Sequence, residues 1–332
     1  MTDVRHHLAL AHEQFPPDAL LRQAAAGERA GFDGVRCSDH FQPWWTPGES
    51  GQAWAWLGAA GATTGDVALG SAVTAPVHRY HPAVVAQAFA TLEIMFPGRL
   101  YMGIGSGESL NETPCGMRWP EPDEQLARMD EALGIIARLL DGEVVDHEGD
   151  HFRTVGARLH SLPARRVPVY VSAFHPGAAD VAARRGDGLW TMADPEIAEP
   201  VLAAYRDACD RLGREPGEVV MHAGFSWAAN DDAALAGASV WKAALVPEFF
   251  TDDWHDPDEM QRHAQEAVSD DALRNGFIIS SDPAEHVERI RDVERLGATI
   301  VVLMNISGAD PEGAIATYGE RVLPALRGAR VP

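Results

Sequence analysis

The sequence has almost no lysine and very little cysteine. Lys242 is the only lysine among 332 residues, and arginine supplies the rest of the basic side chains. We interpret this as the codon bias of a GC-rich genome rather than as a binding device. The three cysteines, Cys37, Cys115 and Cys209, are far apart and follow no disulfide or metal-ligand spacing. The cysteine content therefore predicts a reducing, cytoplasmic location.

Basic charge, long apolar runs and an export signal are also missing. The formal net charge of −22 argues against nucleic acid as a partner. No apolar run approaches the ~20 residues that a membrane span requires. The first seven residues lack the charged and apolar regions of a secretory signal. We therefore expect a small-molecule substrate, with no nucleic acid and no membrane involved.

Three familiar catalytic motifs are absent or out of context. The letters His-Glu-x-x-His occur once, from His147 to His151, but they fall in a predicted β-hairpin and not on the helix that a zinc site of this type requires, so no metal site is predicted. Gly105-Ser106-Gly107 is too short for the Gly-x-Ser-x-Gly elbow of hydrolases. The stretch from Gly103 to Glu108 lacks the Gly-x-Gly-x-x-Gly spacing of a dinucleotide-binding turn. Such a stretch either brings the backbone close to a flat ligand or only satisfies turn geometry.

The regular structure that the sequence does predict is a repeated strand–helix unit. Eight short apolar segments are typical of buried strands, at 8–11, 34–37, 67–73, 100–104, 167–171, 188–191, 219–227 and 299–303. Helical patterns lie between and after them, at 20–30, 53–64, 82–96, 123–140, 177–184, 197–212, 232–244, 282–296 and 312–326. Gly31, Gly186 and Gly297 each end a helix shortly before a strand begins. We predict a (β/α)₈ TIM barrel that occupies residues 1–332 as one domain.

Two segments do not fit the strand–helix repeat. Residues 143–155 alternate in polarity around Glu148-Gly149-Asp150, which predicts a β-hairpin insertion. Residues 245–275 are acidic and rich in aromatic side chains, and we expect them to be irregular. Their position predicts a lid-like insertion.

The stretch from Gly34 to Trp45 begins as a buried strand and ends in polar and aromatic residues. Asp39 beside His40 offers a base and a group that orients it, and Trp44 offers a flat apolar wall. The same residues are also consistent with a purely structural role, in which the aspartate caps the strand end, the histidine is hydrogen-bonded and the tryptophans belong to the core.

Other predicted strand ends carry similar side chains, and in a barrel all of them meet at one mouth. They include Glu13, the segment 73–76, the segment 106–108, the segment 172–175, and Thr191, Trp227 and Asn305. Several such positions together predict an acid–base site at the mouth. The segment Ser172-Ala173-Phe174-His175 also precedes a helix start, where free N–H groups could hold a phosphate.

Three of these motifs together resemble a known family. They are Ser38-Asp39-His40-Phe41-Gln42-Pro43-Trp44, the helix that begins Tyr80-His81-Pro82, and the segment from Gly103 through Glu108 to Asn111-Glu112. The chain resembles the luciferase-like flavin and deazaflavin enzymes, and in particular the dehydrogenases that depend on coenzyme F420 and act on glucose 6-phosphate. The resemblance runs from His12 to the last helix. It implies a TIM barrel, usually a homodimer, with the deazaflavin bound across the strand ends.

The resemblance also implies a role for individual residues. His40 would accept the hydroxyl proton while hydride passes to the deazaflavin, with Trp44 packed on the reacting centre. Glu108 would be a proton donor or electrostatic partner, and Glu13 would orient the substrate. Other residues would contact the cofactor: Asp39, Ala72 and Val73 (joined by a cis peptide bond), Ser106, Gly107, Asn111, Ser172, Ala173 and His175.

The substrate end departs from the family pattern. Thr191 matches the threonine that binds the sugar phosphate, but Asp194 stands where a lysine is expected. We expect Arg262 to replace a second lysine, and Gly276 takes the place of an arginine. Because Asp194 would repel a phosphate, glucose 6-phosphate is a poor candidate unless Arg262, His263 or Arg274 approaches it. Two other functions remain open: an FMN-dependent monooxygenase of the same superfamily, and a barrel that binds a deazaflavin without catalysis.

Overall fold

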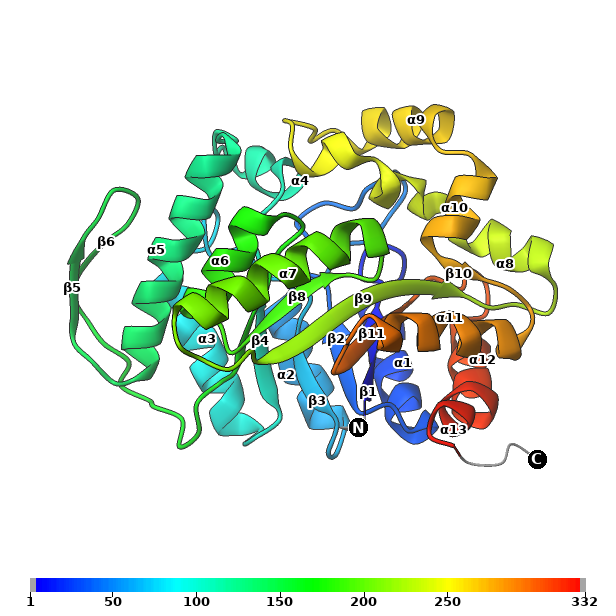
Figure 1. Cartoon of the computed structure of the whole chain (residues 1–332), viewed down its shortest axis with the longest axis horizontal. Helices are drawn as coiled ribbons and strands as arrows, with labels where there is room; N and C mark the ends of the chain where they lie inside the picture. Colours follow the sequence, from blue (N-terminus) through cyan, green and yellow to red (C-terminus); the bar gives the residue numbers. More distant parts are fainter. Residues whose placement is uncertain (1–3, 329–332) are drawn as a thin grey trace.

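The computed structural model describes residues 4–328, and its centre is a closed ring of eight parallel strands (Figure 1). In chain order the ring contains β1 (Arg5–Leu10), β2 (Gly34–Cys37), β3 (Ala68–Ser71), β4 (Leu100–Ile104), β7 (Val169–Ser172), β8 (Gly188–Met192), β9 (Glu218–Ser226) and β11 (Ile300–Asn305). Each strand pairs with the next, and β11 pairs with β1 to close the ring. The short strand β10 (Ile278–Ile279) pairs with β9 alongside the ring. The TIM-barrel prediction is confirmed.

Helices cover the outside of the ring and begin and end at local signals in the sequence. They are α1 (Pro17–Ala30), α2 (Ala53–Thr63), α3 (Pro82–Met95), α5 (Pro122–Leu140), α6 (Pro176–Arg185), α7 (Pro195–Arg211), α8 (Asp231–Ala238), α11 (Pro283–Arg295) and α12 (Pro311–Thr317). Proline opens many of them, where its missing N–H costs nothing. Gly31 and Gly297 follow α1 and α11 with φ of 91° and 104°, the left-handed conformation that favours glycine. Gly186 differs, because its φ of −93° is ordinary extended backbone.

Two of the predicted helices are broken. The pattern at 232–244 forms α8 followed by a 3₁₀ segment, Ser239–Leu245. The pattern at 312–326 forms α12, a π-helical turn (Tyr318–Val322) and α13 (Leu323–Leu326). Within residues 4–328 no helix is both long enough and apolar enough to cross a membrane.

The inside of the barrel is filled by large side chains that alternate with small ones. Arg36 lies there fully buried, with its guanidinium carbon 3.9 Å from the ring centre of Tyr101 and 4.5 Å from that of Trp190. Its Nε donates to Nδ1 of His7 at 3.2 Å. Burial lowers the pKa of Arg36 to about 10, so the guanidinium still carries its charge at neutral pH. These contacts identify which face of each strand points inward.

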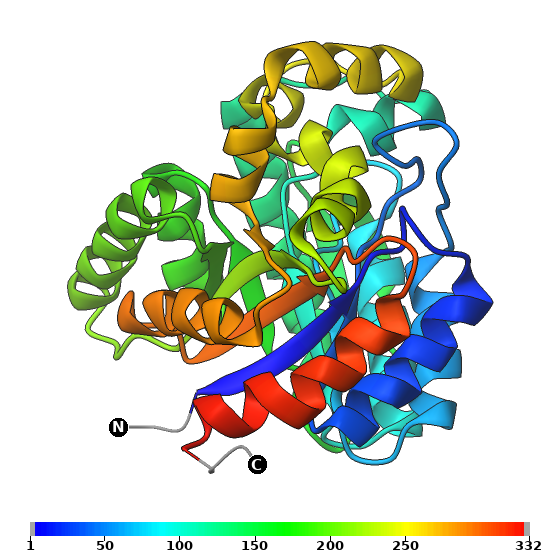
Figure 2. The ribbon, with the colours of Figure 1, turned by 90° about the vertical axis from the view of Figure 1, so that its right-hand side faces the viewer.

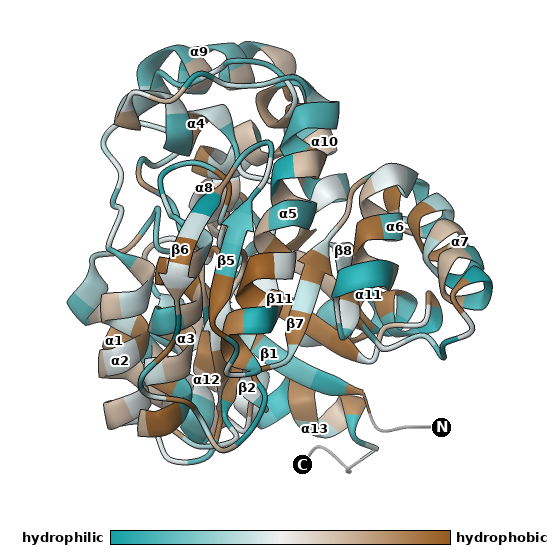
Figure 3. Ribbon diagram, turned by 90° about the vertical axis from the view of Figure 1, so that its left-hand side faces the viewer, coloured by the Kyte–Doolittle hydropathy of each residue, from teal (hydrophilic) through white to brown (hydrophobic). Residues whose placement is uncertain are grey.

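The insertion at 143–155 forms the antiparallel strands β5 (Val145–Glu148) and β6 (Arg153–Ala157), which project from the side of the barrel (Figures 1 and 3). The segment 245–275, called the roof below, contains a 3₁₀ turn (Pro247–Phe250), α9 (Pro257–Ala267) and most of α10 (Asp270–Gly276). The expectation of irregular structure is therefore wrong. Side-chain caps on Asp256 and Ser269 start both helices. The roof lies at one end of the barrel, near the short helix α4 (Ser109–Glu112) (Figures 1 and 2).

Candidate active site

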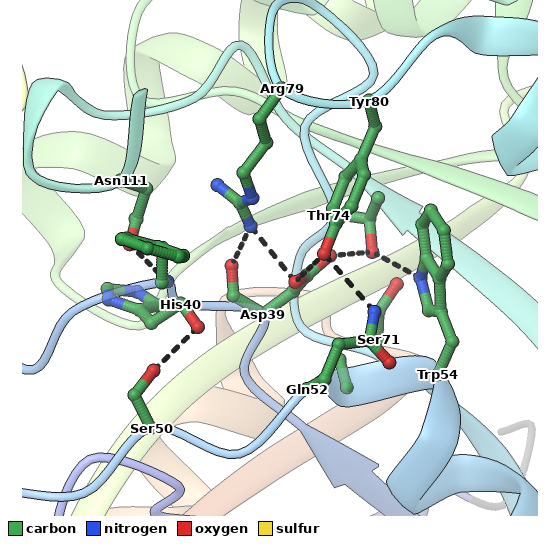
Figure 4. A network of polar contacts seen from close by, with 12 residues as sticks. Asp39, His40, Ser50, Gln52, Trp54, Ser71, Thr74, Arg79, Tyr80 and Asn111 are labelled. Atoms are coloured by element: carbon green, nitrogen blue, oxygen red, sulfur yellow. Dashed lines mark hydrogen bonds and ion pairs between the residues drawn. The ribbon is translucent and has the colours of Figure 1, made fainter. Parts of the chain in front are cut away.

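Asp39 is the centre of a polar network directly after β2 (Figure 4). Its Oδ2 accepts a hydrogen bond from Thr74 Oγ1 at 2.7 Å. Its Oδ1 accepts from Arg79 Nη2 at 2.9 Å and from Tyr80 Oη at 3.2 Å. Only 2% of the Asp39 side chain is exposed. The carboxylate therefore fixes the loops that follow β2 and β3 and has little surface to offer a ligand.

Arg79 extends the network to the next strand end. Its Nη1 donates to Glu112 Oε1 at 2.6 Å, and its backbone N–H donates to the other oxygen of the same carboxylate at 2.8 Å. Burial alone would lower the pKa of Arg79, but the carboxylates of Asp39 and Glu112 raise it above its ordinary value. The segments after β2, β3 and β4 are thereby joined by one buried cation. Sequence reasoning missed Arg79, because its partners lie 33 and 40 residues away.

His40 lies next to this network and faces two carboxylates. Its Nε2 is 3.6 Å from Glu13 Oε1 and 3.6 Å from Glu108 Oε2. Its Nδ1 is 3.3 Å from the carbonyl oxygen of Gln42. A carbonyl can only accept, so in the neutral ring Nδ1 carries the hydrogen and Nε2 presents a lone pair. The structure thus brings together three of the predicted catalytic residues, His40, Glu13 and Glu108, from three different strand ends.

Asn111, on α4, holds the His40 loop and Glu108 in position. Its Oδ1 accepts from the backbone N–H of Phe41 at 2.8 Å, and its Nδ2 donates to Glu108 Oε2 at 3.4 Å. Burial raises the pKa of the Glu108 carboxyl, the nearby His40 lowers it and the charge of Glu13 raises it further. Glu108 can therefore hold a proton at a higher pH than an ordinary glutamate does.

Trp44 forms an aromatic wall between His40 and the roof. Its ring centre lies 5.5 Å from that of His40 and 5.3 Å from that of Phe250. The ring centre of Phe249 lies 6.5 Å from that of Trp44. Trp44 is thus the fourth predicted catalytic residue at this mouth, and it connects the histidine to the roof.

The opposite wall is made mostly of backbone. The Ala72–Val73 peptide bond is cis, as the resemblance implied. A Cβ atom on Gly103 would lie 2.3 Å from the carbonyl oxygen of Ser71, and one on Gly105 would lie 2.6 Å from Val73 Cγ2. Val73 and these glycines are therefore in close contact, and larger residues would not fit. Together they form a closely packed group of small residues near the carboxyl ends of β3 and β4.

Other predicted cofactor residues surround this surface. Ser106 and Gly107 are partly exposed after β4, and Gly107 has a φ of 89°. Ser172 ends β7 and, being paired with Trp190, faces the barrel interior. Ala173 is buried in the cluster between strands and helices, so only its backbone could reach a ligand. His175 is exposed at the position before α6.

Thr191 is buried near the end of β8, its Oγ1 has no hydrogen-bond partner among residues 4–328, and its role as a substrate residue stays a prediction. On β8 the neighbouring Trp190 points inward onto Arg36, so Thr191 points outward. Thr191 pairs with Met221 of the neighbouring strand β9, and Met221 packs between the strands and the surrounding helices. The Thr191 side chain is fully buried. Met192 faces inward instead, since it is paired with His222, whose ring lies 6.1 Å from Trp190.

The remaining positions of the predicted substrate end have local explanations. Asp194 caps α7, its Oδ1 accepting from the backbone N–H of Glu196 at 2.9 Å. Arg262 is exposed on α9 in the roof. Gly276 ends α10, where a Cβ atom would lie 2.7 Å from Leu245 Cδ2. Among residues 4–328 no cluster of histidine, cysteine and acidic side chains could hold a metal ion.

Comparison with known proteins identifies relatives over almost the whole chain. A model of the luciferase-like monooxygenase family matches residues 1–299. An F420-dependent glucose-6-phosphate dehydrogenase of Nakamurella multipartita is 42% identical over 331 residues, which cover 98% of this chain and 97% of that protein. An F420-dependent hydroxymycolic acid dehydrogenase of Mycobacterium tuberculosis is 37% identical over 96% of this chain and 88% of its own length.

A solved structure agrees with these relatives. An F420-dependent secondary alcohol dehydrogenase, in complex with an F420–acetone adduct, superposes with a TM-score of 0.94 at 33% identity and covers 98% of this chain and 99% of its own. Shared sequence over the full length and the shared barrel lead to one conclusion. The chain belongs to the luciferase-like monooxygenase family.

Proposed function

We propose that this protein is an F420-dependent dehydrogenase that oxidises a CH–OH group to a carbonyl. The observation that carries the proposal is the position of His40, whose Nε2 lies 3.6 Å from the carboxylates of both Glu13 and Glu108. A base held between two acids is suited to removing a hydroxyl proton. The relatives described above include F420-dependent dehydrogenases of a sugar phosphate, a hydroxylated lipid and a secondary alcohol.

The mouth fits a flat deazaflavin. Val73 packs its Cγ atoms on Gly103 and Gly105, and this short apolar side chain would contact the flat ring. Glu13 Oε2 is buried and has no hydrogen-bond partner among the described residues, as expected for a group that awaits a substrate hydroxyl. We assign Ala72, Val73, Ser106, Gly107 and Ser172 to the ring and its tail, with the Ala173 backbone and His175 nearby. Asp39 and Asn111 act by holding the loops in place.

The protein's own groups would handle the proton. The substrate hydroxyl donates to Nε2 of His40 while Nδ1–H remains bonded to the Gln42 carbonyl, and Glu13 then stabilises the imidazolium. When bound, F420 supplies the acceptor for the hydride that leaves the carbinol carbon. Trp44 excludes water from the reacting centre, and Glu108 can accept or return a proton because its pKa is raised. Hydride and proton leave together, so alcohol becomes carbonyl with atoms and electrons balanced.

The test is reduction of F420, followed at 420 nm with a panel of alcohols and sugars. His40→Ala should lose roughly 10²–10⁴ in turnover while its F420 affinity stays within about threefold. His160→Ala, an exposed histidine remote from the mouth, is the matched control. Copurified yellow flavin and oxygen consumption with reduced FMN would instead identify a monooxygenase. Tight F420 binding without any turnover would identify a binding protein.

The roof is proposed to be a lid over this site. Ser109 Oγ, adjacent to Glu108, donates a hydrogen bond to the carbonyl of Asp252 or Trp254, at 3.0 and 2.6 Å. Gln42 Nε2 donates to the carbonyl of His255 at 2.9 Å. The roof is thus tied to residues that neighbour both Glu108 and His40. Ordering of the roof would therefore be coupled to the catalytic geometry.

The assembly is proposed to be a homodimer formed through α2 and α3. These helices are neighbours on one flank of the barrel (Figure 3). α2 contains no charged residue, and the only one in α3, Glu93, is 2% exposed. Val84, Ile94 and Met95 of α3 are 49%, 44% and 54% exposed. Uncharged, partly apolar faces of this kind are typical of subunit interfaces. The free thiols of all three cysteines suit the cytoplasm.

A further inference from the structure

The walls of the substrate side determine what kind of alcohol can enter. We infer that the substrate is a neutral secondary alcohol with an apolar arm, not a phosphorylated sugar, and that Met192 and Leu245 set this preference. The inference rests on the proposed dehydrogenase function and specifies its substrate class. It is carried by the side chains of β8, α10 and the roof, none of which takes part in the proton transfer described above.

The inward face at the end of β8 is apolar. Gly188, Trp190 and Met192 alternate along this face, as the pairing of Gly188 with Tyr170 and of Trp190 with Ser172 requires. Thr191, which carries the one hydroxyl on β8, points away from this face because it alternates with Trp190, and its buried Oγ1 has no hydrogen-bond partner among the described residues. Met192 is partly exposed at the mouth, so its thioether side chain is available to contact a substrate. A ligand at this wall therefore meets an apolar, flexible side chain.

The space in front of Gly276 is filled by Leu245. A Cβ atom at position 276 would lie 2.7 Å from Leu245 Cδ2 and 2.9 Å from Cδ1. A longer side chain at 276 cannot be accommodated until Leu245 moves. Leu245 packs against the same apolar cluster as Trp44 and Phe249. An apolar group thus occupies a place from which a basic side chain could otherwise reach the mouth.

Aromatic rings cover the site from above. Phe250 is 5.3 Å from Trp44 and 5.9 Å from Phe174, measured between ring centres. Phe249 packs on Trp254 at 5.1 Å. These rings and Met192 lie around the mouth that holds His40. An alkyl arm there would replace water along apolar surface, which favours binding by about 0.8 kcal/mol for each buried methylene.

The charges at the mouth disfavour an anionic substrate. Two carboxylates, Glu13 and Glu108, lie within 3.6 Å of His40 Nε2. Two neighbouring cations are already paired, Arg79 with Asp39 and Glu112, and Lys242 with Asp270, while His263 Nε2 lies 2.9 Å from Glu248. Arg262, which is exposed on α9, and Arg274 on α10 have no ion pair among residues 4–328. A phosphate monoester carries about −1.5 to −2 charges at pH 7 and would face two acids.

The reaction expected of such a substrate is simple and balanced. A 2-alkanol loses its carbinol hydrogen as hydride to F420 and its hydroxyl proton to His40 Nε2, and leaves as a 2-alkanone. No further oxidant or reductant is needed.

The first experiment compares substrates on the unmodified protein. F420 reduction is measured at 420 nm with 2-propanol, 2-butanol, 2-hexanol, 2-octanol, glucose and glucose 6-phosphate. We expect kcat/KM to rise about fourfold for each added methylene up to the length of the pocket, with the rise carried by KM. Glucose 6-phosphate should be at least about 100-fold poorer than 2-octanol, since a desolvated unpaired charge costs several kcal/mol.

The second experiment tests the two residues. Met192→Lys should lower kcat/KM for 2-octanol by at least about tenfold through loss of apolar contact. Met192→Leu should retain the preference for 2-octanol over glucose 6-phosphate. Val155→Lys adds the same charge on the exposed hairpin and should leave kcat/KM for both substrates unchanged. In the double variant Leu245→Ala/Gly276→Arg, the ratio of kcat/KM for 2-octanol to kcat/KM for glucose 6-phosphate should fall by about tenfold or more. Circular dichroism and F420 binding on each variant exclude misfolding.

The outcomes separate this inference from the proposed function. If glucose 6-phosphate reduces F420 faster than any 2-alkanol, or if chain length has no effect, the substrate class is wrong while the dehydrogenase stands. If F420 binds and neither alcohols nor sugars reduce it, both are wrong. An unchanged preference in Met192→Lys would remove Met192 from the specificity wall.

Discussion

At the scale of single residues, the chemistry depends on which nitrogen of His40 is free. The Gln42 carbonyl fixes the hydrogen on Nδ1, and so Nε2 is left to face Glu13 and Glu108. The two acids differ in how they are held. Glu108 interacts with Asn111, whereas one oxygen of Glu13 has no partner among residues 4–328. Glu13 is therefore the acid with room for a substrate hydroxyl, and Glu108 is the acid tied to the loop.

His12, one residue before Glu13, makes a prediction about stability. Its ring is buried edge-on against Trp56 at 4.8 Å, and burial lowers its pKa from 6.5 to about 4. The folded state therefore binds this proton less well than the unfolded state, and the stability of the protein falls as pH drops from 6.5 towards 4. His12→Phe should remove that loss. It should raise the free energy of unfolding by about 2 kcal/mol at pH 5 relative to its effect at pH 8.

Denaturant titrations of both proteins at pH 5 and pH 8 provide the measurement. His160→Phe, at an exposed position, serves as the control. A difference between wild type and His12→Phe that does not change with pH would contradict the assignment of a neutral His12.

At the scale of elements, the network around Arg79 connects the ends of β2, β3 and β4. Arg79→Met would leave the carboxylates of Asp39 and Glu112 buried without a partner, which costs about 3–5 kcal/mol. Thermal and denaturant unfolding should record this loss. Arg79→Met combined with Glu112→Gln should recover part of it, because one of the two unpaired charges is then absent. If Arg79→Met is as stable as wild type, the network does not stabilise the ends of β2, β3 and β4 as the geometry indicates.

The ties between α4 and the roof give a second prediction at this scale. Ser109→Ala removes the hydroxyl that bonds to the roof carbonyls at 252 and 254. We expect faster amide exchange over 251–256 and a KM raised about five- to tenfold, which corresponds to one lost hydrogen bond of about 1 kcal/mol, with kcat less affected. Ser239→Ala, which removes a hydroxyl bonded within its own turn, is the control. Unaltered exchange in Ser109→Ala would argue against a lid.

How far the sequence predicts such elements depends on whether the signal is local. Strand β4 lies at the predicted residues 100–104, because an apolar run between a helix stop and a polar segment defines it. The roof helices could also have been predicted, since Asp256-Pro257 and Ser269 are ordinary helix starts. The acidic composition of the segment was instead interpreted as a sign of irregular structure. The direction of Thr191 follows only once its neighbour Trp190 is seen to point inward onto Arg36, a contact between residues far apart in the sequence. Arg79 was missed because its partners lie 33 and 40 residues away.

At the scale of the whole molecule, charge and shape together restrict where two copies can meet. Each chain carries a formal charge of −22, so two copies repel one another over most of their surfaces. The α2–α3 face is an exception, since its exposed side chains are uncharged and Val84, Ile94 and Met95 lie along it. Association through this face buries apolar area without bringing acidic residues together. It also leaves the mouth of each barrel clear, because α2 and α3 lie on the flank rather than under the roof (Figures 1 and 3).

Ile94→Asp tests this arrangement. A charge on this face should raise the dimer dissociation constant at least about 100-fold, because an unpaired buried carboxylate costs several kcal/mol. Sedimentation velocity at micromolar concentration should then change from dimer to monomer. Val155→Asp, on β6 of the hairpin and 76% exposed, should leave the dimer intact. The F420 binding of the monomer should persist, since every residue of the proposed site comes from one chain. A wild-type protein that sediments as a monomer, or an Ile94→Asp variant that remains dimeric, would place the interface elsewhere or remove it.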